Sequence, residues 1–97
     1  MKHTRGATCP VEKVARILSD SWTMLIVRDL MVGKKRFSDL ATSLSPISTR
    51  TLTLKLKQLS EDGIVVKDEP YYSLTSKGKN LASIYKEMTV YGKKYLA

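Results

Sequence analysis

Apolar side chains recur at helical spacing along the chain and divide it into short helical segments. Val11, Val14 and Leu18 follow the i, i+3, i+7 spacing, which predicts a first helix that starts near Pro10. A second helix is predicted over residues 22–32, where apolar residues surround most of the axis. Such a helix is typically buried on several sides, so we expect it at the centre of the core.

Two further helices are predicted in the middle of the chain. A short one follows Phe37 and ends before Ser45–Pro46, because proline disfavours helical geometry in the residue before it. A longer one covers residues 49–62 and is closed by Gly63. Its core stripe consists of leucines at i, i+4 and i+7, namely Leu52, Leu56 and Leu59. We expect three serines to cap the second, third and fourth helices: Ser21, Ser38 and Ser48.

The last third of the chain predicts a hairpin and a long helix. Ile64–Val66 is β-branched and predicts a strand, residues 71–75 predict a second strand, and residues 67–70 predict the turn between them. A last helix is predicted over residues 76–96. Four helices, a hairpin and a fifth helix predict a mostly α-helical protein with a small β-hairpin, the plan of a winged helix-turn-helix domain.

Length and charge narrow the class of partner. Ninety-seven residues are enough for one domain, residues 1–97, in which residues 1–7 are expected to be a loose basic arm. Seventeen Lys and Arg against nine Asp and Glu give a formal net charge of +8. This excess favours a polyanionic partner, with nucleic acid ahead of an anionic membrane surface. Together with the predicted fold, it indicates double-stranded DNA.

The composition argues against an enzyme and against a metal site. One His and one Cys cannot supply a four-ligand zinc site, and the chain has neither a GxxxxGK[ST] phosphate loop nor a GxGxxG motif. His3 falls in the predicted arm, and Cys9 has no evident acid–base partner, so no catalytic set can be assembled. We predict no cofactor and no metal.

Cysteine usage and hydropathy predict the compartment. A single cysteine excludes an internal disulfide framework and fits a reducing compartment. Residues 1–12 contain no apolar run that would suit a signal peptide, and the longest apolar run, Met24–Val27, is far too short to cross a membrane. These features predict an intracellular, soluble, cytoplasmic protein without a membrane partner.

An ordered set of short motifs makes the chain similar to a known family. The motifs are Cys9-Pro10-Val11-Glu12, Trp22-Thr23-Met24-Leu25-Ile26, Arg36-Phe37-Ser38-Asp39-Leu40, Ile47-Ser48 with Leu52-Thr53 and Leu56 to Leu59, Asp62-Gly63-Ile64-Val65, and Tyr72-Ser73-Leu74-Thr75 with Gly78. In this order, over residues 9–92, the chain resembles the HxlR-type transcription regulators of bacteria and archaea, relatives of the MarR-type winged-helix proteins. The resemblance implies a dimeric DNA-binding repressor or activator of this fold.

The hairpin departs from the family pattern. The family usually has a longer hairpin between its last two motifs, whereas only residues 66–71 intervene here, and Asp68 and Glu69 in this segment are acidic. A wing this short and acidic gives no reason to expect minor-groove contacts.

The fourth helix is the candidate recognition helix, because the N-terminal half of such a helix enters the major groove. With its leucines inward, a rotation of about 100° per residue places Arg50, Leu54, Lys57 and Glu61 on the opposite side. Arg50 is the expected base reader, since its guanidinium can donate to two acceptors on guanine. Leu54 is a large apolar residue on the solvent-exposed face of the helix, and contact with a thymine methyl group would explain its position there. Further contacts are expected from short hydroxyl side chains: Ser48, Thr49, Thr51 and Thr53. The alternative for Arg50 and Lys57 is ordinary solvation.

A second group of candidate DNA contacts precedes the third helix. Lys34, Lys35 and Arg36 are predicted to form a basic turn that grips phosphates, aided by the helix N-terminus around Ser38. Such contacts add salt-dependent affinity without choice of sequence. Lys67 on the short wing is a weaker candidate. The alternative is a basic loop that serves only solubility.

The second and last helices carry more apolar surface than one small domain needs. The candidates for a homodimer interface, most of them in the dimerisation helix predicted at residues 76–96, are Trp22, Tyr85, Met88, Tyr91 and Tyr95. The alternative is that they pack within their own domain. A two-fold dimer would place two recognition helices about one DNA turn apart, roughly 34 Å, and predicts a palindromic operator.

Cys9 begins the first helix. A thiol at a helix N-terminus, with Lys13 one turn further on, is in a setting that favours the reactive thiolate. Some relatives in the family sense oxidants or electrophiles through a cysteine in this position, so the resemblance implies a redox-sensing role. The alternative is a half-buried thiol that only caps the helix.

The favoured function is therefore a sequence-specific transcriptional regulator, with repression as the expected sign. One rival is a non-specific nucleic-acid-binding or architectural module, whose affinity would hardly depend on sequence and would collapse with salt. Another is a protein–protein winged-helix scaffold, which would have a partner but no operator. The sequence identifies no effector.

Overall fold

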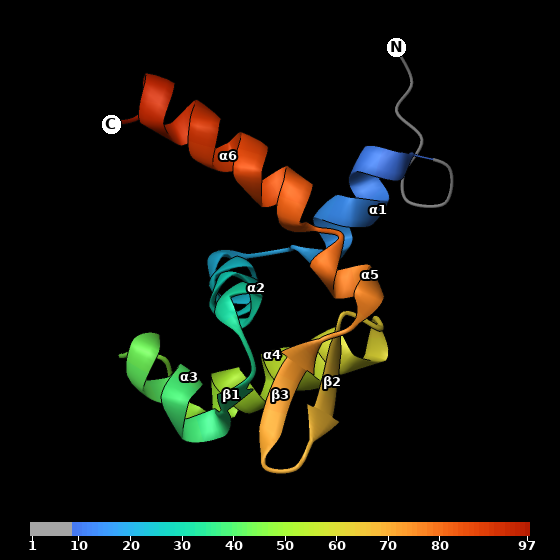
Figure 1. Cartoon of the computed structure of the whole chain (residues 1–97), viewed down its shortest axis with the longest axis vertical. Coiled ribbons are helices and arrows are strands. Elements are labelled where there is room, and N and C mark those ends of the chain that lie inside the picture. The colour runs from blue at the N-terminus through green and yellow to red at the C-terminus, as the bar shows by residue number, and fades with distance from the viewer. Residues whose placement is uncertain (1–8) are drawn as a thin grey trace.

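The computed structural model describes residues 9–97, so the predicted arm at residues 1–7, with His3, lies outside the described residues. The elements in chain order are α1 (Pro10–Ile17), α2 (Ser21–Val32), β1 (Lys35–Arg36), α3 (Phe37–Ser43), α4 (Thr49–Glu61), β2 (Val65–Asp68), β3 (Tyr71–Leu74), α5 (Ser76–Lys79) and α6 (Ala82–Tyr95). The described part of the chain is thus mostly helical with one small sheet, which confirms the predicted winged helix-turn-helix fold. Figure 1 shows α2 at the centre, α1 and α6 at one end, and α3, α4 and the hairpin turn towards the other.

The core forms where α2, α4 and the inner face of the sheet meet. Ile26 and Val27 of α2 are fully buried and share one cluster with the leucines of α4. Leu52, Leu56 and Leu59 are at most 2% exposed, as the leucine spacing predicted. Burying such side chains is the dominant stabilising contribution in a domain of this size. The orientation of α4 is therefore fixed by its own leucines.

The sheet has one strand more than predicted. Residues 34–36 were expected to form a basic turn, but Lys35 and Arg36 form β1, which pairs antiparallel with β3. The strand order is β1-β3-β2, so β3 has a partner on both edges. The predicted turn at residues 67–70 is shorter than expected, because Lys67 and Asp68 belong to β2.

One of the three predicted serine caps is confirmed, and two are wrong. The Ser48 hydroxyl accepts the Thr51 backbone N–H at 3.0 Å and caps α4. In α2 the cap is the Asp20 carboxylate, which accepts the Thr23 backbone N–H at 2.8 Å. At α3, Arg36 is the cap residue, and Asp39 accepts its backbone N–H at 2.9 Å. An aspartate carboxylate is a stronger acceptor than a serine hydroxyl, and its charge suits a helix N-terminus.

The predicted last helix is divided into α5 and α6. The Leu81 backbone N–H bonds the Gly78 carbonyl at 3.0 Å, a tight turn that brings Leu81 into the core. The Thr75 hydroxyl accepts the Gly78 N–H at 3.1 Å and donates to the Gly63 carbonyl, which joins α5 to the end of α4. Beyond this turn α6 projects away from the rest of the molecule (Figure 1). Among the described helices, none has the length and apolar character that a bilayer crossing requires.

Asp20 ties the start of α2 to α4. Its second carboxylate oxygen accepts from the Lys55 ammonium. Burial raises the pKa of Asp20, but hydrogen bonds from Lys55 and from Thr23 outweigh it, and the pKa lies below the ordinary value of 3.8. A carboxyl group whose pKa is lower in the folded protein than in the unfolded chain stabilises the fold. This stabilisation is fully present at pH values above the pKa of the unfolded chain, and it is lost as the pH falls through the pKa of the folded protein.

Asp20→Ala should therefore lower the free energy of unfolding by about 1 kcal/mol at neutral pH. The difference from the wild type should shrink in acid, because protonation of Asp20 removes the same interactions from the wild type. Urea unfolding over a pH series that extends below 3.8 checks this. Asp68→Ala on the exposed wing is the control and should change little. Equal losses for Asp20→Ala at every pH would contradict this assignment.

Candidate nucleic-acid interface

Over residues 49–57 the exposed side of α4 carries hydrogen-bond donors, cations and one apolar residue. We call this surface, formed by Thr49, Arg50, Thr53, Leu54 and Lys57, the recognition face; all five side chains are exposed. Arg50, Leu54 and Lys57 lie opposite the buried leucines, as the helix phase predicted. Leu54 is 49% exposed, so a large apolar side chain does lie on the solvent-exposed side of the helix.

Arg50 is free to bind a ligand. Within residues 9–97 it forms no ion pair and no side-chain hydrogen bond. The neighbouring Lys55 is half-buried and neutralised by Asp20. Arg50 therefore offers its full charge and all of its donors to a ligand.

Two predicted contact residues at the start of α4 are engaged in capping. Thr51 is half-buried, and its hydroxyl accepts from Ser48 Oγ at 2.9 Å. Ser48 also caps the helix, so its hydroxyl has two internal partners. Ser48 and Thr51 thus hold the recognition face in place.

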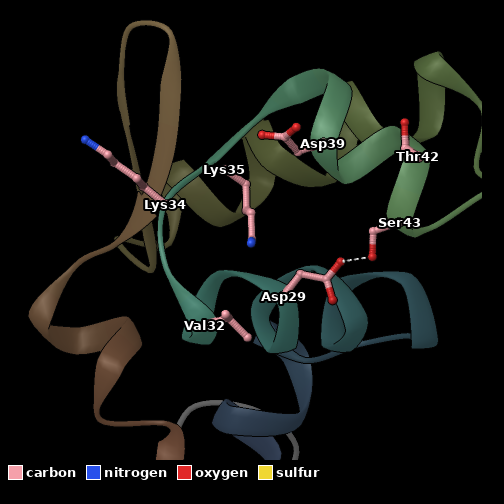
Figure 2. A pocket seen from close by; sticks show the side chains of 7 residues that line it. All are labelled: Asp29, Val32, Lys34, Lys35, Asp39, Thr42 and Ser43. Atoms are coloured by element: carbon pink, nitrogen blue, oxygen red, sulfur yellow. Dashed lines mark hydrogen bonds between the residues drawn. The ribbon is translucent and has the colours of Figure 1, made fainter.

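The three basic residues before α3 do not point the same way. Lys34 Nζ lies 4.4 Å from the centre of the Tyr71 ring, and the Arg36 guanidinium carbon lies 5.4 Å from it. Lys35 lies on the opposite face of β1, and Figure 2 shows its side chain entering a pocket while Lys34 points away. Ser38, in the first turn of α3, is exposed.

The pocket that Lys35 enters separates α2 from α3. Its volume is about 530 Å³, and it is lined by Asp29, Val32, Lys34, Lys35, Asp39, Thr42 and Ser43. Ser43 Oγ donates to Asp29 at 2.7 Å across the pocket (Figure 2). The Arg28 guanidinium donates to the other Asp29 oxygen at 3.0 Å. The Asp29 carboxylate thus joins the two helices.

The wing is short and carries a neutralised lysine. Lys67 Nζ lies 2.9 Å from Glu69 and 5.5 Å from the centre of the Tyr72 ring. The hydrogen bond to Glu69 raises the pKa of Lys67, with a further contribution from Tyr72. Asp68 and Glu69 are exposed beside it, so this wing offers a phosphate little net positive charge.

Sequence reasoning missed Tyr71. Its ring lies beneath Lys34 and Arg36 only because β1 pairs with β3, and it stands directly opposite Arg36 in that pairing. The tyrosine is visible in the sequence, but without β1 nothing in the sequence connects it to the basic residues.

The five candidate dimer residues separate into two groups. Trp22 and Tyr85 are partly buried against the core of their own chain. The Tyr85 hydroxyl donates to the Met24 carbonyl at 2.7 Å, and burial raises the pKa of Tyr85 to about 12. Met88, Tyr91 and Tyr95 lie along the outer side of α6 and are between 48% and 62% exposed.

Cys9 is the residue that precedes α1. Its side chain is half-buried and makes no capping hydrogen bond, while its backbone carbonyl accepts the Lys13 N–H at 3.0 Å. The thiol is thus present at the helix start without a capping role.

The helix-turn-helix formed by α3 and α4, followed by the hairpin, defines the class of winged-helix DNA-binding proteins. The chain belongs to the HxlR-like helix-turn-helix family, whose model matches residues 17–97. It is 38% identical over 96 residues to the HTH-type transcriptional regulator YvaP of Bacillus subtilis, an alignment that covers 91% of this chain and 89% of YvaP. It is 30% identical to the HTH-type transcriptional regulator YodB of the same organism, covering 90% of this chain and 85% of YodB.

Solved structures support the same assignment. The quinone-bound form of YodB from B. subtilis superposes with a TM-score of 0.85 at 33% identity, over 90% of this chain and 100% of that one. A MarR-family transcriptional regulator from Porphyromonas gingivalis W83 gives 0.86 at 28% identity, over 98% and 100%. The reduced form of the redox regulator HypR gives 0.79 at 32% identity, over 89% and 92%. The protein is therefore a DNA-binding transcriptional regulator of the helix-turn-helix type, in a family of regulators and not of enzymes.

Proposed function

We propose that the protein is a homodimeric repressor that binds a palindromic operator through α4. The observation that carries this proposal is the recognition face, which is exposed beside a fully buried leucine row and contains Arg50, a side chain with no ion pair among residues 9–97. As a regulator of transcription it would act in the cytoplasm, where bacterial or archaeal DNA lies.

Each residue of the recognition face has a distinct role in this proposal. Arg50 donates to O6 and N7 of a guanine, and Leu54 contacts a thymine methyl group. Thr49, Thr53 and Lys57 bind phosphates or base edges beside them. Ser48 and Thr51 act mainly through the cap that fixes the start of the helix.

The basic residues outside α4 contribute affinity in this proposal. Lys34 and Arg36 bind phosphates, and Lys35 and Ser38 lie close enough in sequence to assist them. Lys67 contributes least, because Glu69 already neutralises it. These contacts would bind any DNA sequence and would weaken with salt.

The dimer in this proposal is formed through residues 76–96. The outer side of α6 presents Met88, Tyr91 and Tyr95, and the two tyrosine rings lie 4.8 Å apart in a tilted pair. Large apolar side chains exposed together on one helix are typical of a subunit interface. Trp22 and Tyr85 would support this interface from the core side.

Selection of bound duplexes from a random pool, at low and at moderate salt, tests the proposed function. We expect an inverted repeat with half-sites about one DNA turn apart, retained at the higher salt. We expect the preference for this site over random DNA to be about a thousandfold or more. Random recovery whose yield collapses with salt would instead support a non-specific module, and no recovery would support a protein–protein scaffold.

We further propose that Cys9 senses oxidants or electrophiles. Support comes from the place of the half-buried thiol at the start of α1 and from the similarity to HypR, a redox regulator, and to YodB, solved with a bound quinone. Cys9→Ser should bind the operator like the wild type but resist release by a quinone or a peroxide. Equal release of the variant and the wild type in a fluorescence binding assay would rule this role out.

A further inference from the structure

The outward face of the sheet carries a tyrosine that contacts two cations. Arg36 stands directly opposite Tyr71 in the β1–β3 pairing, and Lys34 lies on the same face of the chain two residues earlier. Their cationic groups lie 5.4 Å and 4.4 Å from the centre of the Tyr71 ring. We call Lys34, Arg36 and Tyr71 the tyrosine cluster.

The tyrosine cluster lies at the end of the sheet where DNA is expected. Arg36, Tyr71 and Asp68 form the last row in register before the hairpin turn. Figure 1 places this turn, β1 and α3 at the end of the molecule away from α6. The cluster is therefore close to the helix-turn-helix and far from the proposed dimer helix.

An aromatic ring holds a cation without cancelling its charge. Within residues 9–97 neither Lys34 nor Arg36 forms an ion pair, in contrast to Lys67, which Glu69 neutralises. Contact with the ring removes conformational freedom from two long side chains before any ligand arrives. The exposed Asp68 carboxylate shares the row but pairs with neither cation. The cluster is thus a pair of pre-oriented, unneutralised charges.

We propose that Tyr71 is a positioning residue for DNA binding, whose ring holds Lys34 and Arg36 in place to bind backbone phosphates beside the operator's major groove. The inference rests on the proposed function and adds to it. It makes the outward pair, Lys34 and Arg36, the main phosphate contacts of the basic segment, ahead of Lys35, which enters the pocket, and of Lys67, which Glu69 neutralises. Tyr71 itself acts through the two cations.

The test is a double-mutant cycle on the full chain with a mixed-sequence duplex that lacks an inverted repeat. Affinity is measured over a series of potassium chloride concentrations. The double variant Lys34→Ala/Arg36→Ala should lower the slope of log affinity against log salt by about two per bound protomer. Lys13→Ala on α1, at the far end of the molecule, removes one charge and should leave the slope unchanged.

Tyr71→Leu should weaken binding about fivefold, while Tyr71→Phe, which keeps the ring, should bind like the wild type. In the Lys34→Ala/Arg36→Ala background, Tyr71→Leu should have no further effect, because nothing is left to position. An equal loss in both backgrounds, or an unchanged slope for the double variant, would overturn the inference. If Tyr71→Leu fails to fold, the slope of the double variant still tests whether Lys34 and Arg36 bind phosphates, and an unchanged slope still overturns the inference. A wild type without affinity for any duplex would instead refute the proposed function.

Discussion

Gly78→Ala is expected to lower the free energy of unfolding by about 3 kcal/mol, which is a large share of the roughly 5–15 kcal/mol typical of a domain of this size. A Cβ atom at this position would lie 2.3 Å from the Ile64 carbonyl oxygen. That oxygen is held by the Thr75 backbone N–H at 2.9 Å, so it cannot move without loss of the bond that joins β2 to α5. Urea unfolding followed by circular dichroism measures the effect.

Gly92→Ala is the matched control for Gly78→Ala. Gly92 lies inside α6, and a Cβ there would meet nothing within 4 Å. Alanine is favoured over glycine within a helix, so this variant should be as stable as the wild type or more stable by up to about 1 kcal/mol. If Gly78→Ala unfolded at the same urea concentration as Gly92→Ala, this result would contradict the claim that α5 packs closely against Ile64.

The double variant Met88→Glu/Tyr91→Glu is expected to be monomeric and to lose about a hundredfold in affinity for the operator. Two carboxylates on the outer side of α6 would have to be desolvated in the proposed interface, which is strongly unfavourable. A monomer engages only one half-site and loses the effective concentration that the second half-site provides. Sedimentation velocity gives the mass, and titration against the palindrome and a single half-site gives the affinities.

Val90→Glu adds a carboxylate to another side of the same helix and is the control for the dimer variant. Val90 is 52% exposed, so the charge stays in water and the dimer should persist. A Met88→Glu/Tyr91→Glu protein with the mass and operator affinity of the wild type would contradict the assignment of α6 as the dimer helix.

The parts of the fold that follow from local periodicity could be predicted from the sequence. The leucines of α4 are separated by whole helical turns, so their burial requires no knowledge of distant residues. β1 could not be predicted, because a two-residue strand of lysine and arginine has no apolar alternation and forms only against the free edge of β3. The break between α5 and α6 could not be predicted, because it depends on the Leu81 N–H donating to the Gly78 carbonyl and on the burial of Leu81 in the core.

In the candidate site, too, the features that follow from local helix periodicity could be predicted, and those that depend on distant segments could not. The exposure of Arg50 and Leu54 follows from helix phase and was predicted. The opposite directions of Lys34 and Lys35 follow from strand geometry, and the neutralisation of Lys67 depends on the conformation of the wing. Asp20 replaced the predicted Ser21 cap because it also has a partner in α4, thirty-five residues later in the chain. Pairings between distant segments are what the sequence pattern does not contain.

The affinity of Arg50→Ala for the selected inverted repeat, measured beside that of Arg28→Ala, tests the central claim most directly. Arg28 is an exposed arginine on α2 whose guanidinium is paired with Asp29. Arg28→Ala therefore lowers the net charge by the same amount as Arg50→Ala, but at a site outside the recognition face. We predict that Arg50→Ala loses about ten- to a hundredfold on the repeat and much of its preference over random DNA, while Arg28→Ala keeps both. Equal affinities and equal sequence preference for the two variants would contradict the claim that the exposed side of α4 reads DNA.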